Sequence, residues 1–137
     1  MGALIPAHIT LVHRLADHLD ADVVAQRLRG IPPIRVRITD MARWSGDEIG
    51  MCLAVDDIDG AIAALRESLE VVQPPGLDYL PHVTVLHPHT TAPATVDRAW
   101  TELGEWRPNA EVVIAEVHVI DVGGSGWRTL RIIPLTG

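Results

Sequence analysis

Two copies of one short pattern hold the residues of this chain that are best suited to acid–base chemistry. A histidine, an apolar residue, a threonine, two apolar residues and a second histidine occupy residues 8–13, and the same order recurs at residues 82–87. Histidine side chains titrate at about pH 6.5, so two of them can act as base and acid in one reaction. Threonine hydroxyls can donate hydrogen bonds to the oxygens of an anion. His8 with Thr10, and His82 with Thr84, therefore predict chemistry on a phosphate ester.

Strands must position these four residues. Both copies are apolar and partly β-branched, as short strands are. Side chains two residues apart on a strand point to the same face, so each histidine shares a face with its threonine. If the two copies belong to two similar lobes, the pairs meet across a cleft. His8 and His82 are then the predicted catalytic residues, and Thr10 and Thr84 the predicted phosphate-binding residues.

The segments that follow the two copies also match each other. Each copy is followed by a predicted helix that ends at a glycine, the first capped by Asp20 and ending at Gly30, the second capped by Thr95 and ending at Gly104. Each helix is followed by a predicted hairpin, with strands over residues 34–44 and 49–55, and over 110–122 and 127–134. A further amphipathic helix, capped near Asp57, connects the halves.

This order of elements predicts one α+β domain over residues 1–137. Its lobe-forming repeats cover about residues 7–73 and 81–137, and a pseudo-two-fold axis relates the two lobes, which flank a central cleft. A chain of 137 residues can bury one sizeable core, whereas neither lobe alone could bury enough surface.

Composition restricts the partners. The net charge is −7, and all eleven basic residues are arginines, which argues against an extended nucleic-acid track. A few arginines can still serve one phosphate in a pocket. No stretch approaches the roughly 20 apolar residues of a membrane span, and the start shows no signal peptide, so a soluble cytoplasmic protein without a membrane partner is expected. The single Cys52 lies in an apolar run and is expected to be a buried thiol.

Other residues carry two interpretations each. Arg35 and Arg37 share a strand face, which is either an exposed polar face or a phosphate contact in the cleft. Aromatic residues near strand ends or the second copy either pack at the rim of the core or stack on a base; they are Trp44, Trp127 and Tyr79.

The histidines His87 and His89 could suggest a metal site. No carboxylate or cysteine accompanies them at ligand spacing, and a proline divides them. No metal and no cofactor are therefore expected. His13 and His87 are interpreted as residues of strand ends or loops.

Residues 6–11, Pro-Ala-His-Ile-Thr-Leu, and residues 81–85, Pro-His-Val-Thr-Val, resemble the paired motifs of the two-histidine phosphoesterase superfamily. That superfamily includes bacterial 2′-5′ RNA ligase-like proteins and cyclic nucleotide phosphodiesterases. The resemblance covers nearly the whole chain in element order. It implies a bilobal α+β fold, no metal, and hydrolysis of 2′,3′-cyclic phosphates or 2′-5′ bonds. Carried over by position, it assigns catalysis to His8 and His82 and phosphate binding to Thr10 and Thr84.

The chain departs from this family at its start. Members usually begin with a strand and a helix before the first motif, which here starts seven residues after Met1. Either the N-terminus is trimmed or misassigned, or the last strand, residues 127–134, takes the vacant place.

Three interpretations of function follow. The first is a metal-independent phosphodiesterase that acts on a small cyclic nucleotide or an RNA terminus. The second is a binding module that recognises a nucleotide or RNA end in the same cleft without turnover, and the third is a structural domain in which the four residues do not meet. Two titratable groups favour the enzyme, since binding alone does not need them. The direction, hydrolysis or ligation, and the histidine that acts as base stay open.

Overall fold

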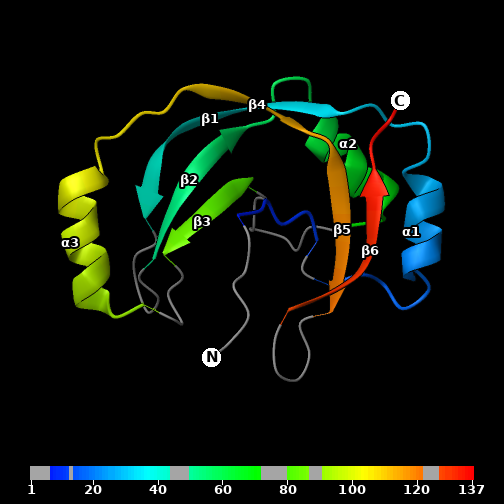
Figure 1. Cartoon of the computed structure of the whole chain (residues 1–137), viewed down its shortest axis with the longest axis horizontal. Coiled ribbons are helices and arrows are strands. Elements are labelled where there is room, and N and C mark those ends of the chain that lie inside the picture. Colours follow the sequence, from blue (N-terminus) through cyan, green and yellow to red (C-terminus); the bar gives the residue numbers. More distant parts are fainter. Residues whose placement is uncertain (1–6, 13, 44–49, 72–79, 87–90, 122–126) are drawn as a thin grey trace.

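The computed structural model describes residues 7–12, 14–43, 50–71, 80–86, 91–121 and 127–137 (Figure 1). The predictions for the turn at residues 45–47 and for Trp44, Tyr79, His13, His87 and His89 lie outside these residues. The elements of the described chain follow in this order: α1 (Ala21–Arg27), β1 (Ile34–Arg43), β2 (Met51–Asp56), α2 (Ala61–Ser68), β3 (His82–Leu86), α3 (Pro93–Leu103), β4 (Ala110–Ile114), β5 (Glu116–Asp121) and β6 (Arg128–Pro134).

Side-chain caps start the first two helices where the sequence predicts them, but α1 ends at Arg27, with Leu28 as its C-cap, before the predicted Gly30. The Asp20 carboxylate accepts a hydrogen bond from the backbone N–H of Val23 at 2.9 Å, at the start of α1. The Asp57 carboxylate accepts bonds from the N–H groups of Ile62 and Ala63, both at 3.0 Å, at the start of α2. These bonds satisfy backbone donors that have no partner within the helix.

The predicted cap of α3 is wrong. The helix begins at Pro93 with Ala92 in the N-cap position, so Thr95 already lies inside its first turn. The carbonyl of Ala92 accepts bonds from the N–H groups of both Thr95 and Val96. Proline favours the first helical position because its missing N–H is not needed there. The predicted end at Gly104 is confirmed.

The strands form two antiparallel sheets, one in the order β3-β2-β1-β4 and the other of β5 and β6. The predicted hairpin of β1 and β2 is confirmed, with an irregularity between Ile38 and Met41. The prediction of one strand over residues 110–122 is wrong, because the chain changes sheets at Ala115. β4 pairs with β1, whereas β5 pairs with β6, and the N–H of Leu135 donates to the carbonyl of Ala115 at 2.8 Å.

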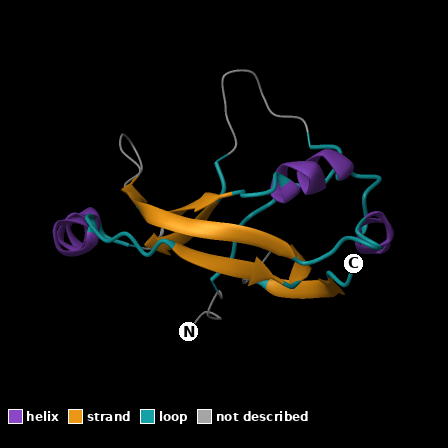
Figure 2. Ribbon diagram, turned by 90° about the horizontal axis from the view of Figure 1, so that it is seen from above, coloured by secondary structure: helices purple, strands orange, loops and turns teal. Residues whose placement is uncertain are grey.

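Alternating burial along the strands places the main core on one face of the larger sheet. Ile34 and Val36 of β1 are 2% and 1% exposed, and they pack in one cluster with residues of α1, α2, β5 and β6. Figure 2 shows α2 lying along one side of the strands. A smaller cluster, with Met41, Met51 and Val96 at its centre, attaches α3 to the other end of the sheet.

The architecture is a mixed α+β fold, as predicted, and its strands form curled antiparallel sheets, but the two-fold relation between lobes is not confirmed. The second copy of the repeated pattern forms strand β3, whereas residues 7–12 form no strand and contribute a single bridge, between Ile9 and Val83. In the described residues, one sheet has four strands and the other two. No helix of the described chain is long and apolar enough to cross a membrane.

Candidate active site

The bridge between Ile9 and Val83 is antiparallel and brings the two copies of the pattern together. Residues that flank an antiparallel bridge lie across from each other, so His8 lies across from Thr84, and Thr10 across from His82. All four side chains are half-buried. The two His-x-Thr pairs, predicted to meet across a cleft, therefore lie on neighbouring segments.

Core packing decides which face the polar residues take. Ile9 and Val83 both pack against the main hydrophobic cluster. Because side chains alternate along an extended chain, the residues on either side of Ile9 and Val83 point to the opposite face. The apolar positions of the pattern thus hold the two segments against the core and turn the histidines and threonines away from it.

The same pairing sets the spacing of the histidines. His8 and His82 are diagonal neighbours across the bridge, a relation in which residues on antiparallel strands lie roughly 7–8 Å apart. Two imidazoles at that spacing can approach opposite sides of one phosphorus, while the threonine on the same face of each segment can donate to its oxygens.

A backbone carbonyl orients the His82 ring. Its Nδ1 lies 2.9 Å from the carbonyl oxygen of Leu80. A carbonyl oxygen can only accept, so Nδ1 carries the hydrogen, and the neutral ring has its lone pair on Nε2. In that neutral ring, Nε2 is the nitrogen that can accept a proton. The sequence gives no signal for this contact, because any residue at position 80 presents a carbonyl.

An aromatic residue lies against His8. The ring centroids of His8 and Trp127 are 4.9 Å apart and the rings are tilted by 51°. Trp127 directly precedes β6, so this contact joins the first copy to the smaller sheet. Of the three aromatics considered from the sequence, Trp127 is the one that the structure brings to the candidate site; Trp44 and Tyr79 lie outside the described residues.

The first copy is also held by helix α2. Nη1 of Arg66, a half-buried residue of α2, donates a hydrogen bond to the carbonyl of Leu11, the residue after Thr10. Sequence reasoning missed Arg66. Its charge fits a solvated helix face equally well, and only the tertiary fold shows that it reaches the segment that follows the first His-x-Thr pair.

Arg35 and Arg37 share a sheet face with His82. Arg37 lies across from Asp56, and Ala54, two residues earlier on β2, lies across from His82. The guanidinium groups of Arg35 and Arg37, however, form ion pairs with carboxylates.

The carboxylates around these arginines come from two elements. Arg35 lies 3.3 Å from Asp59 and 3.2 Å from Glu111, and its pKa is raised, mainly by the hydrogen bond to Asp59. Arg37 lies 3.9 Å from Glu111 and donates to the carbonyl of Asn109 at 3.3 Å. These contacts favour the exposed polar face over a phosphate contact.

Cys52 lies across from Thr84 in the sheet and is 8% exposed. Burial raises the pKa of its thiol, which disfavours the reactive thiolate. The prediction of a buried thiol is confirmed. Within the described residues, no group of three or more histidine, cysteine, aspartate or glutamate side chains is arranged to hold a metal ion.

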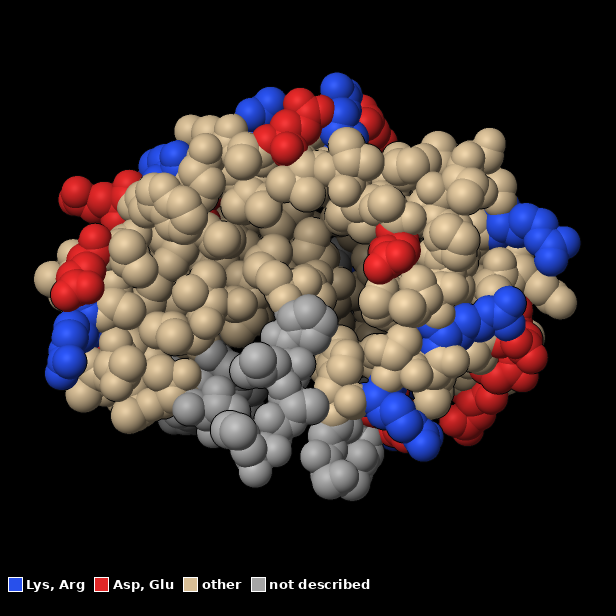
Figure 3. All heavy atoms as spheres, viewed as in Figure 1, with Lys and Arg blue, Asp and Glu red and all other residues tan. Residues whose placement is uncertain are grey.

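Charged side chains are unevenly spread over the face of the molecule seen in Figure 3. Figure 3 shows a hollow near the centre of this face, and the charged side chains gather mainly towards the edges of the molecule. The net charge of −7 argues against binding of an extended polyanion.

One comparison with known proteins gives the family of this chain, and another gives a similar fold. The family described as the 2′-5′ RNA ligase superfamily matches residues 2–126. Among solved structures, the crystal structure of TT0787 of Thermus thermophilus is similar, with a TM-score of 0.66 and 19% sequence identity. The similarity covers 97% of this chain and 81% of that chain. At that identity it shows a shared fold. None of the curated proteins matches this chain.

Proposed function

Because the chain belongs to the 2′-5′ RNA ligase superfamily, whose members are generally phosphoesterases or ligases, we propose that it is a metal-independent phosphodiesterase. Its substrates are 2′,3′-cyclic phosphates or 2′-5′ phosphodiester bonds of nucleotides or RNA ends. The observation that supports this proposal most is the bridge between Ile9 and Val83, because it sets two His-x-Thr pairs side by side.

Two histidines suffice for the proton transfers of hydrolysis. One imidazole, neutral at the start, takes a proton from water as the water oxygen bonds to phosphorus. The other, protonated at the start, gives its proton to the leaving ribose oxygen as the bond from phosphorus to that oxygen breaks. One water is consumed, and a later exchange of protons with solvent restores both rings. For His82, the contact of Nδ1 with Leu80 supports Nε2 as the atom that would fill either role.

The threonines can stabilise the negative charge on the non-bridging oxygens of the phosphate. Thr10 and Thr84 each lie across from a histidine of the other copy, so each hydroxyl can donate to a non-bridging oxygen while the imidazoles handle the bridging ones. Trp127 packs against the His8 ring, and the carbonyl oxygen of Leu80 holds the His82 ring. Because both rings are restricted, less conformational entropy is lost when they are brought into a reactive geometry.

A substrate screen tests the proposal. Purified protein is incubated with 2′,3′-cyclic nucleotides, 2′-5′ dinucleotides and ADP-ribose cyclic phosphate, and the products are identified by chromatography and mass spectrometry. We expect ring opening or cleavage that continues in the presence of EDTA and is lost in His82→Ala. Tight binding of these compounds without product would support the interpretation as a binding module. If the protein neither binds nor converts them, the interpretation as a structural domain is supported.

A further inference from the structure

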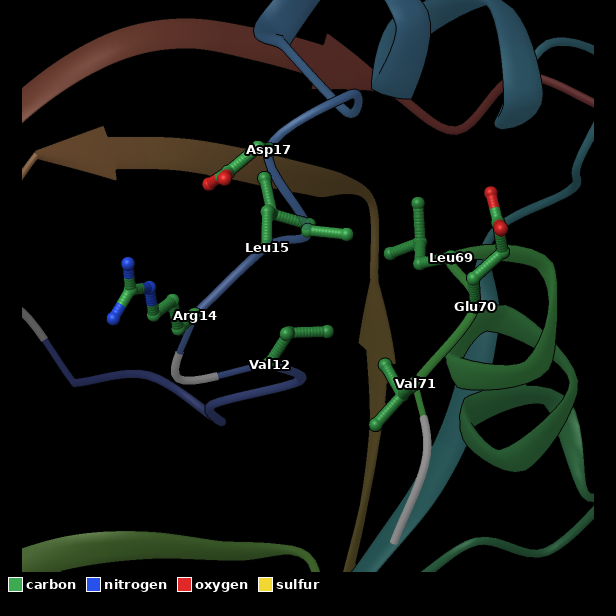
Figure 4. Close-up of a pocket in the computed structure, with 8 residues that line it drawn as sticks. Val12, Arg14, Leu15, Asp17, Leu69, Glu70 and Val71 are labelled. Atoms are coloured by element: carbon green, nitrogen blue, oxygen red, sulfur yellow. The ribbon is translucent and has the colours of Figure 1, made fainter.

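A pocket lies beside the first copy, between the loop that follows it and the end of α2 (Figure 4). Its volume is about 380 Å³, within the range of small-molecule sites. Among the described residues, those that line it come from two segments; they are Val12, Arg14, Leu15, Ala16, Asp17, Leu69, Glu70 and Val71. The proposed reaction at the four motif residues does not use them.

Apolar side chains that belong to the main core or pack against it form part of the walls of this pocket. Leu69 is 4% exposed and belongs to the main core, and Val12, Leu15 and Val71 pack against that core. Side chains of this kind contact the faces of a flat, uncharged ring without needing a hydrogen bond from it.

Two carboxylates add acceptors to these walls. Figure 4 shows Asp17 and Glu70 on opposite sides of the pocket, with Arg14 on the side away from Glu70. Glu70 is held in place: His18 Nε2 lies 3.0 Å and Arg27 Nη1 2.5 Å from its Oε2. The hydrogen bonds from His18 and Arg27 lower the pKa of Glu70, so it presents an ionised carboxylate.

The backbone at Glu70 is also held in one conformation. Its φ is 58°, an uncommon conformation for a residue other than glycine. Arg27 additionally donates to the carbonyl of Ser68 at 3.1 Å, which ties the chain just before Glu70 to α1. Both contacts described for the carboxylate end on Oε2, so Oε1 is its remaining acceptor.

The pocket adjoins the place where the phosphate is proposed to bind. Thr10 and Val12 are two residues apart, so their Cα atoms are separated by at most about 7 Å. A ribose bridges a comparable gap between the phosphate and the base of one nucleotide. A nucleotide whose phosphate meets Thr10 can therefore place its base in the pocket.

We propose that this pocket binds the base of the substrate and selects adenine and cytosine, which carry an amino group at C6 and C4 respectively, over hypoxanthine and uracil, which carry an oxo group at the same position. The inference rests on the proposed function for the nucleotide character of the substrate. A carboxylate can only accept and an amino group donates, whereas an exocyclic oxygen can only accept. The oxo base would leave a carboxylate facing an acceptor, and we expect about tenfold weaker binding.

Binding of reaction products tests this selection without requiring catalysis. Isothermal titration of the wild-type chain with 3′-AMP and 3′-IMP, and with 3′-CMP and 3′-UMP, should give Kd values about tenfold lower for the amino-bearing member of each pair. Glu70→Gln should bring these ratios close to one, because an amide can either accept from an amino group or donate to an oxo group. Asp17→Asn should lower them as well.

Glu67→Gln is the matched control, since it removes a carboxylate of the same kind from the exposed end of α2, outside the pocket. The ratios should persist in this variant. Equal binding of the two members of each pair by the wild-type chain overturns the inference, as does a ratio that survives in both folded carboxylate variants. The outcome is separable from the proposed function: selective binding without hydrolysis of any cyclic phosphate refutes the phosphodiesterase alone, and hydrolysis without selection refutes the base pocket alone.

Discussion

Ile9 and Val83 form an antiparallel bridge, and both pack against the main hydrophobic core. Their apolar contacts and the alternation of side chains leave the flanking histidines and threonines on the other face. The two copies of the pattern therefore meet with their apolar residues on the core, and the candidate site is formed by the polar residues on the opposite face. Predictions about its chemistry can be made residue by residue.

The imidazoles should be the most costly side chains to remove. General acid–base assistance is worth about 10²–10⁴-fold, so His8→Ala and His82→Ala should each reduce kcat/KM on the substrate found in the screen by that order. The double variant should lose less than the product of the single losses, because both groups act on one transition state. Steady-state kinetics measures all three.

His118→Ala is a suitable control for these histidine variants. His118 lies on β5, is exposed, and is paired with Glu116 at 2.8 Å. We expect near wild-type kinetics for it. If His8→Ala or His82→Ala folds normally and keeps wild-type turnover, the two-histidine mechanism is wrong.

The rate should depend on pH in a bell shape. One imidazole must be neutral and the other protonated, so activity falls on both sides of an optimum. The two limbs belong to the pair, since groups that act on the same phosphate titrate together. Profiles of kcat/KM across the range from about pH 5 to pH 8, where histidines titrate, are the measurement. A flat profile across that range contradicts the division of roles.

Loss of a threonine hydroxyl should have a milder effect than loss of an imidazole. Thr10→Ala and Thr84→Ala each remove one neutral donor, worth about 1 kcal/mol or roughly fivefold, from an oxygen that other donors can still reach. Thr101→Ala is the control, because Thr101 bonds only to the carbonyl of Asp97 among the contacts described for it. If a threonine variant has a lower kcat/KM than both histidine variants, the proposed roles are wrong.

Arg66 should act as a positioning residue. Arg66→Met removes the donor to the Leu11 carbonyl and leaves that acceptor without it, so we expect kcat to fall about tenfold while KM changes less. Arg66→Lys keeps a charged donor and should restore part of kcat. A loss of thermal stability in Arg66→Met with unchanged kcat would show that the contact supports only the fold.

The sequence was sufficient for the features that local signals determine. Asp20 caps α1 and Asp57 caps α2 as predicted, and the hairpin of β1 and β2 forms as predicted, because caps and alternation act over a few residues. The identity of the four motif residues also followed from a pattern in the chain. Their roles stay a prediction.

Features that depend on contacts between distant segments could not be read from the sequence. The change of sheets at Ala115 is set by pairing of β4 with β1, a choice that the mostly apolar sequence of residues 110–122 does not encode. Residues 7–12 read as a strand, yet contribute one bridge, because a short apolar segment takes its structure from the partners available. The hydrogen bond from Arg66 and the contact of Trp127 with His8 likewise need the tertiary fold.

The carboxylate of Glu70 should make stability depend on pH in a defined direction. Hydrogen bonds from His18 and Arg27 lower the pKa of Glu70 in the folded chain. A lowered pKa in the folded state adds stability that is present above the ordinary glutamate value of about 4.3 and is lost as the pH falls through the lowered value. The contribution should be small, because these side chains are partly exposed and water screens them.

Thermal unfolding of Glu70→Gln measures this effect. At neutral pH its Tm should lie below that of the wild-type chain, since the amide cannot form the ion pair with Arg27. As the pH falls below the ordinary glutamate value of about 4.3, the wild-type carboxylate becomes protonated and the two Tm values should converge. Glu67→Gln, which removes a charge of the same kind from the exposed end of α2, is the control and should show no such convergence. A Tm difference between Glu70→Gln and wild type that stays constant across this range would show that Glu70 stabilises the loop by packing rather than by its charge.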